Sequence, residues 1–159
     1  MDQPLYWLLT PINNETRLYC CLILASSIAE ISSSVVQPVF AIIQTFESEL
    51  QELIEIAVSF SKKGSSNVIV LSIPDWSAFP FAEGRDINKI TGEIDDFNAI
   101  VKRTAQENEV LFFDITDISR LASEQPELIA EDLLHPSGEM YRLWVEKIIN
   151  NKEFQEIDF

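Results

Sequence analysis

The chain has 159 residues, of which 47% are hydrophobic and 23% are charged. This composition is typical of one globular domain and excludes a disordered chain, a collagen-like chain and a disulfide-stapled scaffold. The 26 acidic residues outnumber the 11 basic residues and give a net charge of −15, which repels phosphate backbones and anionic membrane surfaces, so no nucleic-acid partner is expected.

The first 43 residues differ in character from the rest of the chain. They contain four charged residues and no glycine, whereas the other 33 charged residues and all four glycines come later. The two cysteines of the chain, Cys20 and Cys21, are adjacent and cannot readily bridge each other, which fits a reducing compartment. We therefore expect an atypical segment over residues 1–43, in which residues 19–25 or 35–43 form a makeshift strand.

No segment of the sequence predicts a leader or a membrane span. The residues at the start lack the basic stretch of a secretory signal. The apolar run over residues 18–29 is interrupted by Glu30, well short of the length that a membrane span needs. A cytoplasmic location is expected on this basis.

A helix followed by a strand is predicted after residue 44. Apolar residues recur at helical spacing from Thr45, and Lys63-Gly64 is a typical helix end, because basic residues favour the last turn and glycine favours the position after it. The apolar residues of this helix are Phe46, Leu50, Leu53, Ala57 and Phe60. Residues 67–73 form a β-branched run closed by Pro74, which is typical of a strand buried on both faces of a parallel sheet.

The alternation of helix and strand continues to the end of the chain. Residues 86–108 predict a second helix, residues 110–115 a second buried strand, and residues 119–130 a short helical stretch. A loop over residues 132–136 and a last helix over residues 137–150 follow. This order predicts an α/β fold, a three-layer α/β/α sandwich around a parallel sheet, in which ligands bind at the carboxyl ends of the strands.

Polar residues follow both predicted strands at that edge. Asp75 and Trp76 come after the first strand, and we expect them to line the mouth of a crevice. Asp114 ends the second strand, and we expect its carboxylate to be structural rather than catalytic.

His135 is the only histidine in the chain, so any imidazole base must be this residue. Asp132 precedes it by three positions on the predicted loop, a spacing that lets the carboxylate accept the Nδ1 proton and leaves Nε2 open to take a proton from a hydroxyl. The alternative is an ordinary surface turn in which Asp132 binds local amides. One histidine among scattered carboxylates gives no metal-ligand pattern, so neither a metal nor a cofactor is expected.

Three segments, in this order and spacing, resemble the carboxyl-terminal two-thirds of bacterial SGNH (GDSL-type) hydrolases. They are Leu-Ser-Ile-Pro-Asp-Trp-Ser-Ala-Phe-Pro-Phe-Ala over residues 71–82, Phe-Asp-Ile-Thr-Asp-Ile-Ser over residues 113–119, and Asp-Leu-Leu-His-Pro-Ser-Gly-Glu-Met-Tyr over residues 132–141. The resemblance covers about residues 45–148. It implies a flavodoxin-like α/β/α sandwich that hydrolyses carboxylic esters of lipids or small molecules without a metal, with Asp132 and His135 as the acid and base of a catalytic triad.

The sequence departs from this family in its front segment. The family's nucleophilic serine lies in a Gly-Asp-Ser block near the start of the domain, and a Gly-x-Asn turn helps to build its oxyanion hole; residues 1–43 contain neither. Ser26 and Ser27 lack the neighbouring glycine that usually allows a nucleophile turn. Ser137 is expected to cap the last helix and Ser72 to be buried. The nucleophile is therefore unknown.

We interpret residues 44–159 as a partial hydrolase domain, incomplete at its N-terminus and preceded by a truncated or frame-altered segment. One function is that of a weak or inactive ester hydrolase, and the alternative is a non-catalytic remnant or protein-interaction module. A sheet that lacks a strand has an exposed edge, so we expect that, unless the front segment supplies a makeshift strand, the chain self-associates through this edge, aggregates or is degraded. An acidic adaptor unrelated to hydrolases is supported only by the net charge of −15.

Overall fold

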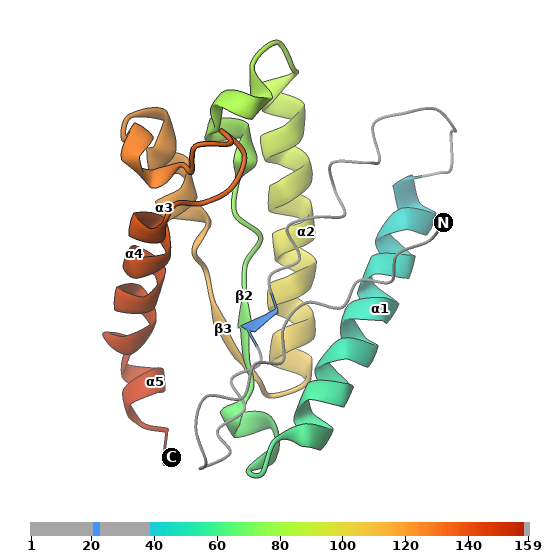
Figure 1. Cartoon of the computed structure of the whole chain (residues 1–159). Coiled ribbons are helices and arrows are strands. Elements are labelled where there is room, and N and C mark those ends of the chain that lie inside the picture. Colours follow the sequence, from blue (N-terminus) through green and yellow to red (C-terminus); the bar gives the residue numbers. More distant parts are fainter. Residues whose placement is uncertain (1–20, 23–38, 158–159) are drawn as a thin grey trace.

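The computed structural model describes residues 21–22 and 39–157 (Figure 1). In chain order, the strands and α-helices of these ranges are β1 (Cys21–Leu22), α1 (Val39–Phe60), β2 (Ile69–Leu71), α2 (Ile87–Glu107), β3 (Leu111–Phe113), α3 (Thr116–Arg120), α4 (Gly138–Ile149) and α5 (Lys152–Gln155). Short 3₁₀ helices cover Gly64–Asn67, Trp76–Ala78, Pro80–Ala82, Leu121–Ser123 and Pro126–Leu128. Ser26 and Ser27 lie outside the described residues, as do residues 19–20 and 23–25 of the first proposed strand and residues 35–38 of the second, which was proposed over residues 35–43.

β1, β2 and β3 form a small parallel sheet with β2 in the middle. The predicted parallel α/β fold is confirmed at this level, as a helix-rich chain around a small sheet. Both β2 and β3 are shorter than the predicted strands. The reason is that the backbone beyond them bonds to side chains instead of to the next strand: the N–H of Ile73 donates to Asn98 Oδ1 and that of Ile115 to Ser72 Oγ.

α1 begins at Val39, six residues before the predicted start. The expectation that residues 35–43 form a strand is therefore wrong for residues 39–43, which are helical. In the sequence Pro38 comes directly before this helix, and proline is tolerated at a helix start because its missing N–H needs no partner there. The composition break at residue 44 falls within α1 and marks no boundary between elements.

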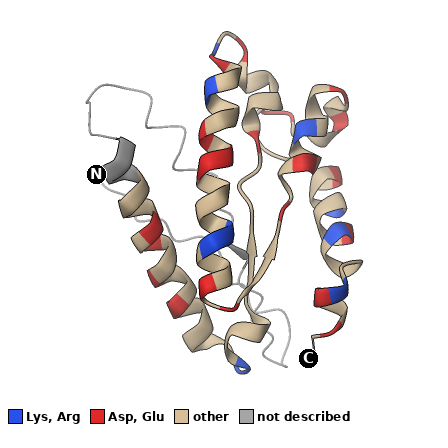
Figure 2. Ribbon diagram, turned by 180° about the vertical axis from the view of Figure 1, so that it is seen from behind, with Lys and Arg blue, Asp and Glu red and all other residues tan. Residues whose placement is uncertain are grey.

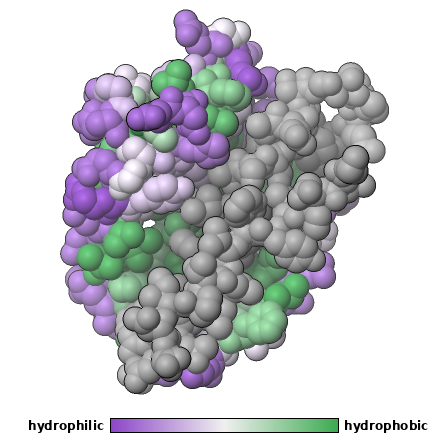
Figure 3. Space-filling view, viewed as in Figure 1, coloured by the Kyte–Doolittle hydropathy of each residue, from purple (hydrophilic) through white to green (hydrophobic). Residues whose placement is uncertain are grey.

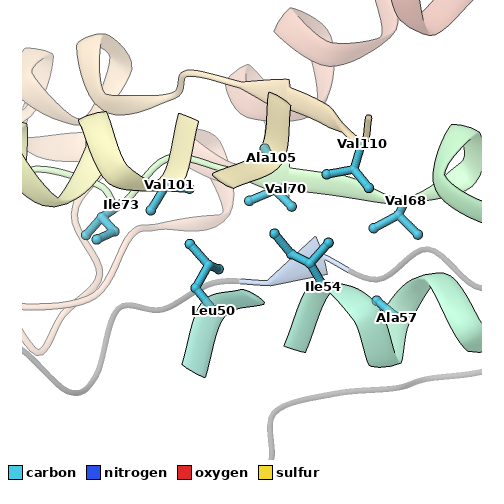
Figure 4. Packing of buried hydrophobic residues seen from close by; sticks show 9 residues of the cluster. All are labelled: Leu50, Ile54, Ala57, Val68, Val70, Ile73, Val101, Ala105 and Val110. Carbon is cyan, nitrogen blue, oxygen red and sulfur yellow. The ribbon is translucent and has the colours of Figure 1, made fainter. Parts of the chain in front are cut away.

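One hydrophobic cluster lies between the sheet and helices α1 and α2 (Figure 4). Side chains alternate across a strand, so Val68 and Val70 face this cluster while Ile69 and Leu71 face the opposite side. Leu50 and Ile54, one helical turn apart on α1, are almost completely buried against it. Burial of each of these side chains stabilises the fold by roughly 1.5 to 3 kcal/mol.

A second cluster fills the other face of the sheet. Ile69 and Leu71 of β2 meet Phe113 of β3 there, and Met140 and Trp144 of α4 cover them. Helices therefore pack on both faces of β2 and β3, as Figure 1 shows with α1 and α2 on one side and α4 on the other.

The two helices that the sequence predicted best have side-chain caps. Asp86 Oδ1 accepts the N–H of Lys89 at the start of α2, and Ser137 Oγ accepts the N–H of Met140 at the start of α4. Such caps satisfy amides that have no partner within the helix. Within residues 39–157, no helix combines the length and the apolar character needed to cross a bilayer.

Candidate active site

Asp132 and His135 lie in the loop of residues 129–137, which joins the Pro126–Leu128 turn to α4. Figure 1 shows this loop at the end of the molecule toward which β2 and β3 run, that is, at their carboxyl ends. The loop is closed by a bridge between Ile129 and Pro136, in which the Ala130 N–H donates to the His135 carbonyl oxygen at 2.8 Å. The structure thus places both predicted residues on the edge where parallel sheets bind ligands.

The Asp132 carboxylate contacts His135 in two ways. Its Oδ2 lies 2.5 Å from the imidazole Nδ1, and its Oδ1 accepts the backbone N–H groups of Leu134 at 3.0 Å and His135 at 2.9 Å. The intervening Leu133 has φ +64°, in the left-handed region. This conformation turns the chain back on itself, so that one carboxylate reaches two backbone amides and the ring.

The hydrogen bonds hold the pKa of Asp132 down to about 2, with the His135 N–H as the largest cause, the His135 side chain next and the Leu134 N–H third. The carboxylate is therefore ionised near neutral pH and only accepts hydrogen bonds. A neutral ring bound to it carries its proton on Nδ1, which makes Nε2 the basic nitrogen. The side chain of His135 is 65% exposed, so solvent and small molecules reach this ring.

Asp75 occupies a different environment from the one expected. Its side chain is 1% exposed, and its carboxylate accepts the Ser77 N–H at 2.9 Å and the Arg120 Nε–H at 2.8 Å. Arg120 also binds Asp95 on α2. Asp75 therefore joins the segment after β2 to α3 and α2, and its carboxylate is not presented to solvent at a crevice.

Trp76, the other residue expected at the crevice, is half-buried and lies near the candidate loop. Its ring packs edge-on against Phe81 with the centroids 5.9 Å apart. The Phe81 N–H donates to the Leu133 carbonyl oxygen at 3.2 Å. The structure thus brings Trp76 and the loop of His135 together through Phe81, which the sequence did not single out for this role.

A buried polar network joins the carboxyl ends of β2 and β3. Ser72 Oγ donates to Asp114 Oδ1 at 3.0 Å and accepts the Ile115 N–H and the Thr116 hydroxyl. Burial by itself would raise the pKa of Asp114, but hydrogen bonds from Thr116 and Ser72 lower it overall, helped by the charge of Lys147. Ser72 is buried, as its place in the sequence predicted, and it binds its neighbours rather than His135.

Asn98 on α2 completes this network and was not predicted from the sequence. Its side-chain amide binds both the N–H and the carbonyl oxygen of Ile73, and it donates to the Thr116 hydroxyl. The sequence does contain a signal for the strand-end turns of this network. After each strand, an aspartate (Asp75 or Asp114) is followed two positions later by a serine or a threonine. Such pairs form side-chain turns that hold a strand end, but nothing in the pattern identifies an asparagine on a distant helix.

No serine of the described residues is hydrogen-bonded to His135. Ser137, two positions after it, caps α4 as predicted and donates to the Glu127 carbonyl oxygen at 2.7 Å. Ser26 and Ser27 lie outside the described residues. The part of the chain that the structure describes therefore contains an imidazole held by a carboxylate, with no serine hydroxyl hydrogen-bonded to that imidazole.

No three histidine, cysteine, aspartate or glutamate side chains within residues 21–22 and 39–157 are grouped to hold a metal ion. Comparison with known proteins gives no match to a family model, to a curated protein or to a solved structure.

Proposed function

We propose that residues 44–159 belong to an SGNH-type ester hydrolase, with the three-layer α/β/α arrangement of that family, and that Asp132 and His135 are its orienting acid and general base. The observation that carries the proposal is the 2.5 Å contact between His135 Nδ1 and Asp132 Oδ2 on an exposed loop at the carboxyl end of a parallel sheet. The family resemblance of residues 71–82, 113–119 and 132–141 supports it independently.

The chemistry follows from the position of the protons. The Nε2 lone pair of His135 takes a proton from a water molecule while the water oxygen forms a bond to the ester carbonyl carbon, and the carbonyl π electrons move to the carbonyl oxygen. Collapse of this adduct breaks the bond to the alcohol oxygen, which receives the proton from the imidazolium. Asp132 remains ionised throughout and stabilises the charged ring.

Hydrolysis by this chain is proposed to be weak. The chain contains neither a Gly-Asp-Ser block nor a Gly-x-Asn sequence. Each missing oxyanion donor lowers kcat by a factor of about 10² to 10³. Without these donors we expect a rate far below that of a complete triad, but above that of an equal concentration of free imidazole.

Hydrolysis of p-nitrophenyl acetate tests the proposed base. We expect a rate above that of equimolar free imidazole, a fall to the buffer rate in His135→Ala, and a fall to the free-imidazole rate in Asp132→Asn. A wild-type rate equal to that of free imidazole, or full activity in His135→Ala, would contradict the proposal. A fluorophosphonate probe is expected to form no His135-dependent adduct; such an adduct would locate the attacking serine and show that activity is not limited as proposed.

A second candidate function is that of a non-catalytic interaction module. The observation in its favour is a row of exposed apolar side chains on α4, formed by Tyr141, Val145 and Ile149 at intervals of four residues. Absence of hydrolysis together with a sedimentation coefficient that falls to the monomer value in Val145→Asp would favour this function over the hydrolase.

A further inference from the structure

Arg85 occupies an unusual place for a cation in so acidic a chain. Its guanidinium carbon lies 4.7 Å from the centroid of the Phe81 ring and 5.4 Å from that of the Trp76 ring. Because the two rings also contact each other, the three side chains form one cluster, called here the Arg85 cluster. Both distances are within the range at which a cation is attracted to an aromatic ring.

The other arginines of the described residues have a different environment. Each binds two carboxylates: Arg103 with Glu47 and Glu107, Arg120 with Asp75 and Asp95, and Arg142 with Glu139 and Glu146. Acidic positions are abundant over the helices (Figure 2). Arg85 nevertheless forms no ion pair with any described residue, although Glu83 and Asp86 are close to it in sequence. Its N–H donors at the guanidinium edge are therefore available.

The Arg85 cluster adjoins the candidate active site. The Phe81 N–H donates to the carbonyl oxygen of Leu133, the residue between Asp132 and Leu134 in the loop of His135. Phe81 is 37% exposed and Leu133 is 52% exposed. Figure 3 shows apolar surface among hydrophilic residues at this end of the molecule. The Arg85 guanidinium and the His135 imidazole therefore lie on two segments that the hydrogen bond between Phe81 and Leu133 joins.

We propose that Arg85 binds a carboxylate of the substrate beside His135, so that the esters cleaved are those of dicarboxylic acids or of other acids that bear a second carboxylate. This inference rests on the proposed hydrolase function. A guanidinium presents two parallel N–H donors whose spacing matches the two oxygens of a carboxylate. The two rings already hold the side chain in place, so little side-chain entropy is lost on binding.

The charge of the whole chain favours a monoanion over a dianion. The net charge of −15 repels every anion at long range, and the repulsion is about twice as large for a phosphate dianion as for a carboxylate. At physiological ionic strength the long-range part is screened beyond about 8 Å, whereas contact with the guanidinium persists. A single carboxylate is therefore the preferred anion.

The test is an NMR titration of the intact chain with monomethyl succinate, an ester that has one carboxylate, and with dimethyl succinate as the uncharged match. His135 is the only histidine, so it gives one set of ring signals, and Trp76→Phe identifies one indole signal among three. We expect monomethyl succinate to shift both the Trp76 and His135 signals at concentrations at which dimethyl succinate shifts neither. Equal binding of both esters, or tighter binding of methyl phosphate, would overturn the proposal.

Variants separate recognition from a structural role. Arg85→Gln keeps most of the side chain without its charge. It should weaken the binding of monomethyl succinate by at least about tenfold. Arg103→Gln removes a paired arginine far along α2 and should leave binding unchanged. If Arg85→Gln shifts the free Trp76 signal but binds the monoester as well as the wild type, Arg85 only supports the rings and the proposal fails.

His135→Ala distinguishes this proposal from the proposed function. The variant should lose hydrolysis while still binding monomethyl succinate at the Trp76 signal. If neither the wild type nor any variant hydrolyses the ester, but monomethyl succinate still binds in a way that depends on Arg85, the hydrolase proposal is refuted and the carboxylate-binding site stands. Hydrolysis that depends on His135, with no effect of Arg85→Gln on binding, would refute the carboxylate site and leave the hydrolase.

Discussion

The segment after β2 and the loop before α4 contain the same local structure in opposite surroundings. Asp75 accepts the N–H of Ser77 and Asp132 accepts the N–H of Leu134, each two residues further on. The second carboxylate oxygen differs in its partner: Asp75 binds the Arg120 guanidinium, whereas Asp132 binds the ring of His135. Asp75 is buried and Asp132 is 53% exposed.

This difference shows that burial decides the use of a common turn. The buried carboxylate joins three elements, and its partner cation has no proton to exchange near neutral pH. The exposed carboxylate instead holds a solvent-exposed ring and fixes which of its nitrogens carries the proton of the neutral form. Changes in the strand-end network should therefore affect stability, whereas changes in the exposed loop should affect which nitrogen of the neutral ring carries its proton.

The largest expected effect is in the buried network. Asn98→Leu removes the partner of the Ile73 N–H and one partner of its carbonyl oxygen. An unsatisfied buried amide costs about 1 to 3 kcal/mol, and we expect the free energy of unfolding, measured in urea, to fall by that amount. Asn88→Leu, at an exposed position of the same helix, is the matched control and should change stability by less than about 0.5 kcal/mol. Equal losses in both variants would show that the network is not the cause.

The second expected effect is on the ring itself. Asp132→Asn replaces an acceptor-only group by an amide, so the proton of neutral His135 is no longer held on Nδ1. Imidazole ¹⁵N shifts at alkaline pH should change from the Nδ1–H tautomer to a mixture, with little change in unfolding. Asp96→Asn, exposed on α2, is the control and should leave the single tautomer intact. A mixture already present in the wild type would contradict the assigned hydrogen bond.

A third effect concerns the titration of Asp132. Its pKa is about 2 in the folded chain, below the ordinary value of 3.8. A carboxyl group whose pKa is lowered by folding stabilises the fold at every pH above its ordinary pKa of 3.8. This stabilisation is lost as the pH falls from 3.8 through about 2. Carboxyl ¹³C shifts should therefore place the midpoint near 2 in the wild type. In His135→Ala the midpoint should move only part of the way back, because the two backbone donors remain.

The fold could be predicted from the sequence where the apolar pattern is strong and an end signal is clear. Residues 86–108 were predicted as a helix, and α2 spans Ile87–Glu107 with Asp86 as its cap. The start of α1 was missed because residues 39–43 are apolar without polar interruption, and such a run fits a strand as well as a helix. Helix α5 is a single turn, too short to show a pattern.

The candidate site could be predicted where its residues are neighbours in sequence. Asp132 and His135 were found because a spacing of three on a loop permits contact. The buried pairing of Asp75 with Arg120 joins positions 45 apart, and the contact of Phe81 with Leu133 joins positions 52 apart. Such contacts depend on how the helices pack on the sheet, which local periodicity does not specify. The pairing of Arg85 with Phe81 and Trp76 joins positions only four and nine apart, but it was missed because these residues lie in irregular turns that show no helix or strand periodicity.

The smallest expected effect is at Leu133, whose positive φ brings Asp132 back onto His135. The left-handed region costs a non-glycine residue about 1 to 2 kcal/mol, and glycine avoids this cost but loses about 0.5 to 1 kcal/mol through the entropy of the unfolded chain. Leu133→Gly should therefore raise the free energy of unfolding by no more than about 1 kcal/mol and leave the imidazole tautomer unchanged.

Leu133→Pro cannot adopt this φ and loses the N–H that donates to the Ala130 carbonyl oxygen, so it should release the ring from the carboxylate. Glu109→Gly, at φ +55° before β3, relaxes a similar backbone away from the loop. Only if the tautomer responds to Leu133→Pro, and to neither glycine variant, is the turn at Leu133 the feature that holds the base in place.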